Sequence, residues 1–153
     1  MTPTLNTTIR PATLSDSGHI AQLLGELGYP TTVDSIPARL SALAAEQISI
    51  ALVAEVDGVP VGVITAHSIA SIHDDENVTW ITTLAVSSAV RQAGVGRALV
   101  EAAERWAQER GCKRISVTTA LHRAVAHTFY ERLGYEHSGR RYTKKFAKPS
   151  HSL

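Results

Sequence analysis

The 153-residue chain has little of the chemistry that marks several protein classes. A single cysteine, Cys112, excludes an intramolecular disulfide. The formal net charge of +1 leaves no electrostatic footprint for nucleic acid or an anionic membrane. The first four residues carry no signal-like apolar segment, and the chain contains no internal repeat. These absences favour a cytoplasmic protein that binds neither nucleic acid nor a membrane, and no metal site is predicted.

Two nucleotide-binding motifs are also missing. A P-loop requires Gly-Lys-Ser/Thr after four spacer residues, and no such string exists in the chain. The Rossmann pattern requires a third small residue after Gly94 and Gly96, but Leu99 occupies that position. Nucleotide binding by either route is therefore disfavoured.

What the chain does have is a length and a 44% hydrophobic content typical of one domain, here residues 1–153 with a core of about 9–146. Apolar spacing and turn residues predict a mixed, partly antiparallel α/β sheet covered by helices. The expected helices cover 20–27, 35–43, 95–110 and 124–133, and end at glycine where Gly28 and Gly111 follow. The expected strands cover 50–56, 59–66, 80–86 and 115–119, with a final hairpin from 135–136 and 142–146.

The most informative stretch runs from Leu84 to Leu99, where an apolar strand passes through a glycine turn into a helix. Gly94 and Gly96 let the backbone approach a bulky anion without a Cβ in the way. The unpaired amides and the dipole of the helix start then favour a phosphate. Arg91 and Arg97 flank the turn and supply charge-assisted bonds. The pattern predicts a pyrophosphate cradle, with a glycine-softened turn as the alternative.

Arg-x-x-Gly-x-Gly at 91–96 resembles the acyl-CoA signature of the GNAT superfamily of N-acetyltransferases. Residues 126–135 are similar to the second signature of that superfamily, a helix with an aromatic-Tyr pair that closes at a glycine. Ile9-Arg10-Pro11-Ala12 followed by Asp16 resembles its opening strand and first helix. The similar segments span about 9–146 in the expected order. The resemblance implies about six to seven strands flanked by about four helices, and acetyl-CoA as the acyl donor.

In that superfamily the strands corresponding to 81–86 and 115–119 splay apart, so backbone groups of Leu84 and Val86 are expected to pair with the pantetheine amides of the cofactor. A buried backbone group needs such a partner. Ser88 and Gln92 stand where a proline and a glycine are common, without removing an amide from the cradle. The expected cofactor contacts are Leu84, Ala85, Val86, Arg91, Gln92, Ala93, Gly94, Val95, Gly96, Arg97 and Ala98. His122 and Arg123 are open as further contacts or as surface cap residues.

Tyr130 matches the frequent general-acid position of the superfamily. A phenol donates a proton from an apolar cleft to the departing CoA thiolate. Its alternative role is an aromatic anchor beside Phe129, Leu133 and Tyr135. Cys112, with no histidine beside it in sequence, is expected to be an inert thiol rather than a nucleophile.

The general base is left open. Family members often carry a glutamate on the strand before the cradle, but this chain has Thr82 and Thr83. A threonine hydroxyl does not deprotonate an ammonium. The alternatives are a water held by the threonines, a substrate bound as free amine, or a side chain from the neighbouring strand and loop: His67, His73, Asp75 or Glu76. The acidic run 74–76 is either an attractor for a cationic amine or a solvated turn.

Together these features predict an acetyl-CoA-dependent N-acetyltransferase in which an amine attacks the thioester directly in a ternary complex. The acceptor is a small amine, an aminoglycoside-like polyamine, an amino-acid derivative or a protein amino group. Transfer of a longer acyl chain is one alternative. A catalytically weak acyl-CoA sensor, which kept the cradle and lost the base, is another. A homodimer is also left open.

Overall fold

A computed structural model describes residues 6–46, 48–90, 93–118 and 124–147. The chain divides into two compact units, Met1–Val117 and Thr118–Leu153, and each is described by itself. A single domain over 1–153 stays a prediction.

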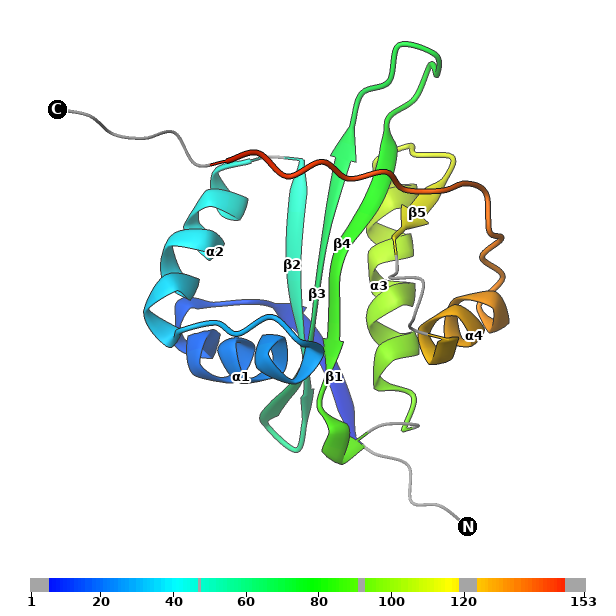
Figure 1. Ribbon diagram of the computed structural model, residues 1–153. Helices are drawn as coiled ribbons and strands as arrows, with labels where there is room; N and C mark the ends of the chain where they lie inside the picture. Colours follow the sequence, from blue (N-terminus) through cyan, green and yellow to red (C-terminus); the bar gives the residue numbers. More distant parts are fainter. Residues whose placement is uncertain (1–5, 47, 91–92, 119–123, 148–153) are drawn as a thin grey trace, which may run out of the picture. The chain divides into compact units, whose positions relative to one another are not determined.

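The first unit holds one five-stranded sheet in the order β1-β2-β3-β4-β5 (Figure 1). The strands are β1 (Thr7–Pro11), β2 (Ser49–Val56), β3 (Val59–Ile69), β4 (Val78–Val86) and β5 (Ile115–Val117). Neighbouring strands are antiparallel except β4 and β5, which are parallel. The sheet is therefore mixed and largely antiparallel, as predicted. Asp57 and Gly58, both at positive φ, close the predicted β2–β3 hairpin.

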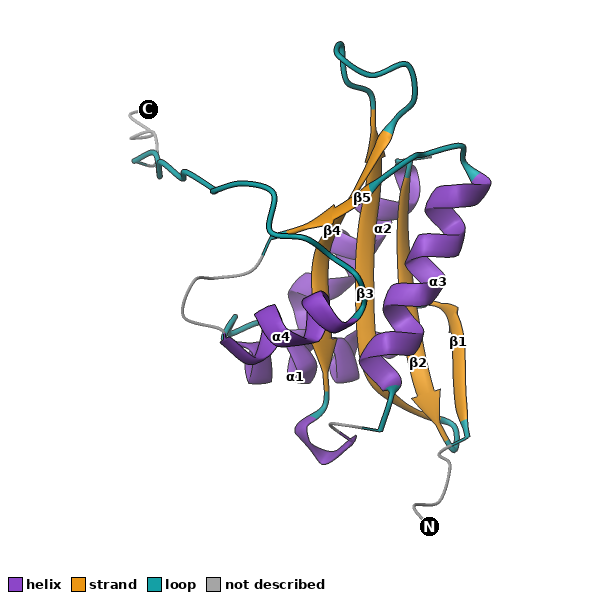
Figure 2. Ribbon diagram, turned by 90° about the vertical axis from the view of Figure 1, so that its right-hand side faces the viewer, coloured by secondary structure: helices purple, strands orange, loops and turns teal. Residues whose placement is uncertain are grey.

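Helices cover both faces of this sheet (Figure 2). On one face lie α1 (Ser17–Leu27) and α2 (Ile36–Ala45), entered through the short 3-10 helices η1 (Leu14–Asp16) and η2 (Val33–Ser35). On the other face lies α3 (Val95–Glu109), which follows η3 (Ser88–Val90). The core on the α1 and α2 face consists of buried apolar side chains from both helices and three strands: Ile20, Ala21, Leu23, Ile36, Val53, Val63 and Ala85.

Helix α3 packs closely on β3 at a glycine of the strand. A Cβ at Gly62 would lie 2.9 Å from Leu99 Cδ1 and 3.2 Å from Val95 Cγ1. Leu99 is fully buried there. In the Rossmann pattern the small residue at this contact is on the helix. Here it is on the strand, as Gly62, and the helix contributes the large Leu99, which is therefore a core residue.

The second unit contributes α4 (Ala124–Arg132). Three helices end in the same way: the amide of the residue after a glycine reaches back to a carbonyl in the last turn. The bonds are Tyr29 to Leu24, Cys112 to Ala107 and Tyr135 to Tyr130, each 2.9–3.0 Å. These ends at Gly28, Gly111 and Gly134 were predicted from the sequence. Within the described ranges, no helix is long and apolar enough to cross a membrane.

The strand count is lower than expected. The described residues form five strands rather than six to seven, and the predicted final hairpin of 135–136 with 142–146 is wrong, because no strand occurs over 133–147. That segment has the aromatic residues of a strand, but Arg140, Arg141, Lys144 and Lys145 interrupt them, and Tyr142 and Phe146 are largely exposed. A two-stranded hairpin without a third strand or a covering helix is marginal in water.

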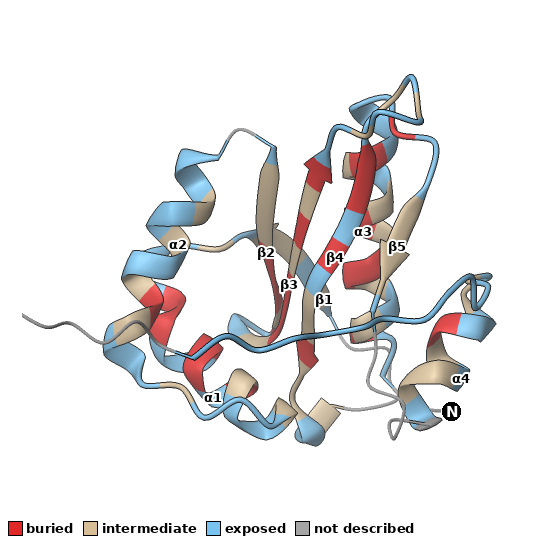
Figure 3. Cartoon of the chain, turned by 45° about the horizontal axis from the view of Figure 1, so that its top comes forward, coloured by how far each residue is buried: buried red, intermediate tan, exposed pale blue. Residues whose placement is uncertain are grey.

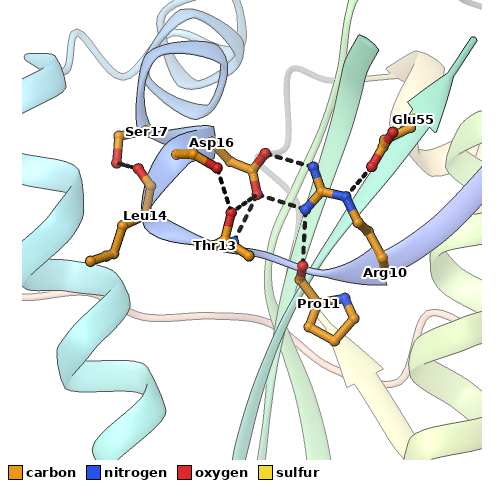
Figure 4. A network of polar contacts seen from close by, with 8 residues as sticks. Arg10, Pro11, Thr13, Leu14, Asp16, Ser17 and Glu55 are labelled. Carbon is orange, nitrogen blue, oxygen red and sulfur yellow. Dashed lines mark hydrogen bonds and ion pairs between the residues drawn. The ribbon is translucent and has the colours of Figure 1, made fainter. Parts of the chain in front are cut away.

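A polar network joins β1 to β2 and to the start of α1 (Figure 4). The Arg10 guanidinium donates to both carboxylate oxygens of Asp16, at 2.7 and 2.8 Å, and also to Glu55. Asp16 is buried, and its Oδ2 accepts the Thr13 amide at 2.7 Å. Chiefly because Arg10 hydrogen-bonds its carboxylate, the pKa of Asp16 falls to about 2. Arg10 and Asp16, which belong to the first segment of the family resemblance, therefore stabilise the junction of β1 with the start of α1.

Candidate functional site

The ladder between β4 and β5 is short. It pairs Thr79 with Ile115, Trp80 with Ser116 and Ile81 with Val117, where β5 ends. Strand β4 continues to Val86, and beyond Ile81 it has no strand partner on this edge among the described residues. The described ladder between β4 and β5 thus stops before Thr82, and the splaying apart of 81–86 and 115–119 stays a prediction.

The backbone groups of Leu84 and Val86 face this open edge. Ser87 donates its amide to Val61 of the β3 side at 2.8 Å. Because successive residues of a strand alternate in direction, Ala85 also faces β3, whereas Leu84 and Val86 face away from it. A β-bulge at Thr82 changes which residues of β4 have their backbone groups directed at β3. Thr65 pairs with Thr83 but Ala66 with Ile81, so Thr82 is the extra residue.

Helix α3 begins where the sequence predicted. Gly94 is its N-cap, with φ +84°, a conformation that side chains resist, and nothing lies within 4 Å of a Cβ built there. No side chain of the described residues caps the first turn. The Ala98 amide donates to the Gly94 carbonyl at 3.0 Å and Ala93 donates to Val90 at 3.3 Å, so neither of these two amides is available to a ligand. The amides of Val95, Gly96 and Arg97 are those that an α-helix leaves without an intrahelical partner.

The side chains predicted to lie near the cofactor at this turn differ in what the structure shows of them. Val95 is buried against β3, so only its backbone serves a ligand. The Arg97 side chain binds Glu101 one turn along the helix, Nε to Oε1 2.7 Å, and both are well exposed. Arg91 and Gln92, like His122 and Arg123, lie outside the described residues.

In the second unit, Tyr130 on α4 is buried, 8% exposed. Its ring makes edge contacts with Phe129 and Tyr135, with centroids 5.1 and 5.6 Å apart. Burial raises the pKa of the Tyr130 phenol to about 12. The phenol therefore keeps its proton throughout the physiological pH range, as a proton or hydrogen-bond donor must.

Cys112 is buried between two hydroxyl groups. Its sulfur lies 3.3 Å from Ser68 Oγ and 3.2 Å from Thr79 Oγ1. This burial is what the prediction of an inert thiol requires. Among the described residues, no group of three His, Cys, Asp or Glu side chains could hold a metal ion.

Buried stretches alternate with intermediate or exposed ones along β3 and β4 (Figure 3). Several polar residues of these strands and of β2 lie on the face of the sheet that carries α1 and α2. Ser49, His67 and Trp80 are directly opposite one another on β2, β3 and β4. Two residues along, Thr65 and the bulged Thr82 share a hydrogen bond, Oγ1 to Oγ1 2.8 Å. Trp80 is 38% exposed. Because Val63 of the core and His67 are four residues apart on one strand, they lie on the same face.

His67 is held at one ring nitrogen, Nδ1, by two neighbouring side chains. Its Nδ1 lies 2.6 Å from Ser49 Oγ and 3.5 Å from Glu46 Oε2, and Ser49 Oγ donates to the same carboxylate oxygen at 2.9 Å. Sequence reasoning identified His67 but missed Glu46, Ser49 and Trp80. The strand register that brings them together spans 18 residues and leaves no local signal.

The other candidate bases lie on the loop between β3 and β4. His73 is 73% exposed and contacts Ser71 through both ring nitrogens, at 2.9 and 3.3 Å. Asp74 is paired with Arg114 at 2.6 Å, and Glu76 lies 3.4 Å from Lys113 Nζ. Two of the three acidic residues at 74–76 are therefore matched by cations of this chain. This pairing weakens their case as attractors of a cationic substrate.

Comparison with known proteins adds four findings. The model of the family described as "Acetyltransferase (GNAT) family" matches residues 23–135. An aminoglycoside N(6')-acetyltransferase type 1 from Stenotrophomonas maltophilia is 28% identical over 137 residues, covering 87% of this chain and 88% of that protein. A solved structure named as a transcriptional regulator from Bacillus halodurans is 28% identical, with TM-score 0.83 over 92% of this chain and 100% of that one. An aminoglycoside N-acetyltransferase solved in complex with CoA has the same fold, with TM-score 0.81 and 21% identity over 95% and 98% of the two chains.

Proposed function

Because the chain belongs to the acetyltransferase (GNAT) family, we propose that it moves acetyl from acetyl-CoA to a primary amine by direct attack within a ternary complex. The observation that carries the acetyl-CoA part of this proposal is the open edge of β4 at Leu84 and Val86, which is followed along the chain by the uncapped start of α3. Relatives named as N-acetyltransferases support the reaction class.

Two parts of acetyl-CoA, the pantetheine arm and the pyrophosphate, suit two features of the first unit. Backbone groups of Leu84 and Val86 suit the amides of the pantetheine arm, which would stand where a strand is missing. The amides of Val95, Gly96 and Arg97, with Gly94 leaving room beside them, suit the pyrophosphate. Arg97 reaches a phosphate by leaving Glu101, an exposed pair whose loss costs little.

Tyr130 is proposed as the hydrogen-bond donor to the sulfur of the leaving group. The gap between its pKa of about 12 and the value of about 8.5 for an ordinary alkyl thiol corresponds to about 5 kcal/mol. Complete proton transfer from the phenol is therefore unfavourable, and a hydrogen bond that strengthens as the thiolate forms is the better role. A bond of that kind contributes most where water is excluded.

The proposed acceptor is a small cationic amine that approaches the face carrying His67, Trp80 and Thr82. Glu46 at the edge of this face is 55% exposed and offers a negative charge. The Trp80 ring offers a surface for an ammonium group. The aminoglycoside acetyltransferase among the relatives supports polycationic amines as the first class to try.

The test is release of free thiol from acetyl-CoA against a panel of aminoglycosides, polyamines, amino-acid derivatives and peptide amines. Saturable, amine-dependent release is expected, with both substrates required before either product leaves. Tight acetyl-CoA binding without turnover would instead favour the sensor. A strong preference for longer acyl-CoA donors would favour the longer-chain transferase.

A further inference from the structure

We propose that His67 is the general base of the acetyl transfer, and that Ser49 and Glu46 position it. This inference rests on the proposed function and names a catalytic residue for it. His67, on the neighbouring strand, would take the role of the glutamate that is missing at Thr82 and Thr83.

The hydrogen bonds around His67 fix which ring nitrogen is free. An ionised carboxylate only accepts, so the 2.9 Å contact requires the Ser49 hydroxyl to donate to Glu46. That hydroxyl has a single proton, so at the 2.6 Å contact it accepts, and Nδ1 of His67 donates. The neutral ring then carries its lone pair on Nε2, for which the described residues supply no hydrogen-bond partner. A base needs this free lone pair.

The same arrangement stabilises the ring once it is protonated. Glu46 Oε2, 3.5 Å from Nδ1, then forms an ion pair with the imidazolium. No other charged side chain of the described residues lies within ion-pair distance of His67. The His67 side chain is 24% exposed, so a proton taken from the substrate has a way out to water.

His67 also lies on the correct face and at a suitable distance. It shares the face with Trp80 and with the Thr65–Thr82 bridge at the bulge, where the open edge of β4 begins. Residues one strand over and two along are about 8 Å apart at the backbone, which leaves room for an amine between His67 and Thr82. His73, by contrast, is on the exposed loop and has both ring nitrogens at Ser71.

The proton balance is as follows. The ammonium substrate gives one proton to Nε2 of His67, and the freed lone pair forms the carbon–nitrogen bond. The carbon–sulfur bond breaks, and sulfur leaves with its electron pair. The nitrogen loses its second excess proton, which ends on the CoA thiol, while the proton on His67 passes to water. The products are the amide, free CoA and one proton.

The test compares pH profiles of kcat, at saturating acetyl-CoA and with the best amine of the panel, for the parent, His67→Ala and His67→Gln. The kcat of the parent is expected to rise with pH and then to level off, because a general base acts only in its unprotonated form. Both variants are expected to lose more than about a hundredfold at neutral pH and to keep rising into the alkaline range as free amine accumulates. Acetyl-CoA affinity by calorimetry should not change. Added imidazole should restore part of the rate to His67→Ala.

Two further arms separate positioning from structure. In Glu46→Gln and Ser49→Ala kcat should fall about three- to thirtyfold while the KM for acetyl-CoA stays unchanged, because these residues orient the ring and do not touch the cosubstrate. His19→Ala, an exposed histidine of α1, is the matched control and should stay within twofold. A parent profile retained by His67→Ala to within twofold would overturn the assignment and leave the proposed function standing, with a water relay or free-amine binding in its place. No amine-dependent turnover in the parent would overturn both.

Discussion

At the scale of single residues, Gly94 is the position where an added side chain should affect acetyl-CoA binding most. Its φ of +84° excludes a branched side chain without strain, and the space beside it is open. Gly94→Val is expected to abolish acetyl-CoA binding in a protein that still folds, as measured by calorimetric titration with circular dichroism as the check.

The matched control is Gly58→Val, because Gly58 has φ +80° and equally open space but lies in the β2–β3 hairpin. The two substitutions should cost similar stability while only the first affects binding. Unchanged affinity in folded Gly94→Val would remove the pyrophosphate assignment. Gly96→Val should also weaken binding, whereas Arg97→Ala should weaken it less because the backbone amides remain.

Tyr130 is the second residue on which the chemistry depends. Tyr130→Phe keeps the ring and its contacts with Phe129 and Tyr135 but removes the hydroxyl. Turnover is expected to fall ten- to a thousandfold with nearly constant acetyl-CoA affinity. Because the raised pKa of about 12 keeps the phenol protonated, the parent should show no alkaline loss of kcat below about pH 10 that is absent from the variant.

Tyr135→Phe, in the same aromatic group, is the control and should stay within about threefold. If Tyr130→Phe retains turnover within twofold at every pH, the phenol only packs, and the thiolate leaves without it.

At the scale of elements, the backbone amides of β4 point alternately toward β3 and toward the edge without a strand partner. Amides of Leu84 and Val86 face the open edge, and the amide of Ala85 faces β3. In the free protein, amide exchange at Leu84 and Val86 should be faster than at Ala85. Saturating acetyl-CoA should slow exchange at the two edge amides and leave Ala85 nearly unchanged, as read by residue-resolved hydrogen exchange. Equal protection of all three in the free protein would mean that another segment already pairs with this edge.

The elements also show what the sequence predicts and what it does not. Turn chemistry is local, so Asp57-Gly58 and the glycine helix ends were read correctly. Strand period alone does not give register, so the extra residue at Thr82 and the meeting of Ser49 with His67 were not predicted. The final hairpin failed for a related reason: its aromatic residues suit a strand, but a strand also needs a partner.

At the scale of the whole molecule, Asp16 in the Arg10–Asp16–Glu55 network makes the stability of the fold depend on pH in the acid range. The pKa of Asp16 is about 2 when folded and 3.8 as the ordinary value, so folding favours the charged form. The stabilisation, about 2 kcal/mol, is complete above pH 4 and is lost as the pH falls from about 4 to 2. Asp16→Asn should therefore lower the free energy of unfolding by about that amount at pH 7, measured in urea.

The difference between parent and Asp16→Asn should shrink as the pH falls below 4. Asp75→Asn, on the exposed loop, is the control and should change the unfolding free energy by less than about 0.5 kcal/mol. A difference that is constant from pH 6 to pH 2.5 would show that the carboxylate contributes through shape rather than charge.

The edge of β4 that faces away from β3, which has no strand partner from Thr82 to Val86 among the described residues, also affects how two chains of this protein can associate. A free strand edge with apolar residues such as Leu84 is a template on which a second chain can add a strand, and so a starting point for aggregation. Acetyl-CoA bound along that edge, as proposed above, would block the template. The concentration of acetyl-CoA would then affect the rate of aggregation of the protein as well as its turnover.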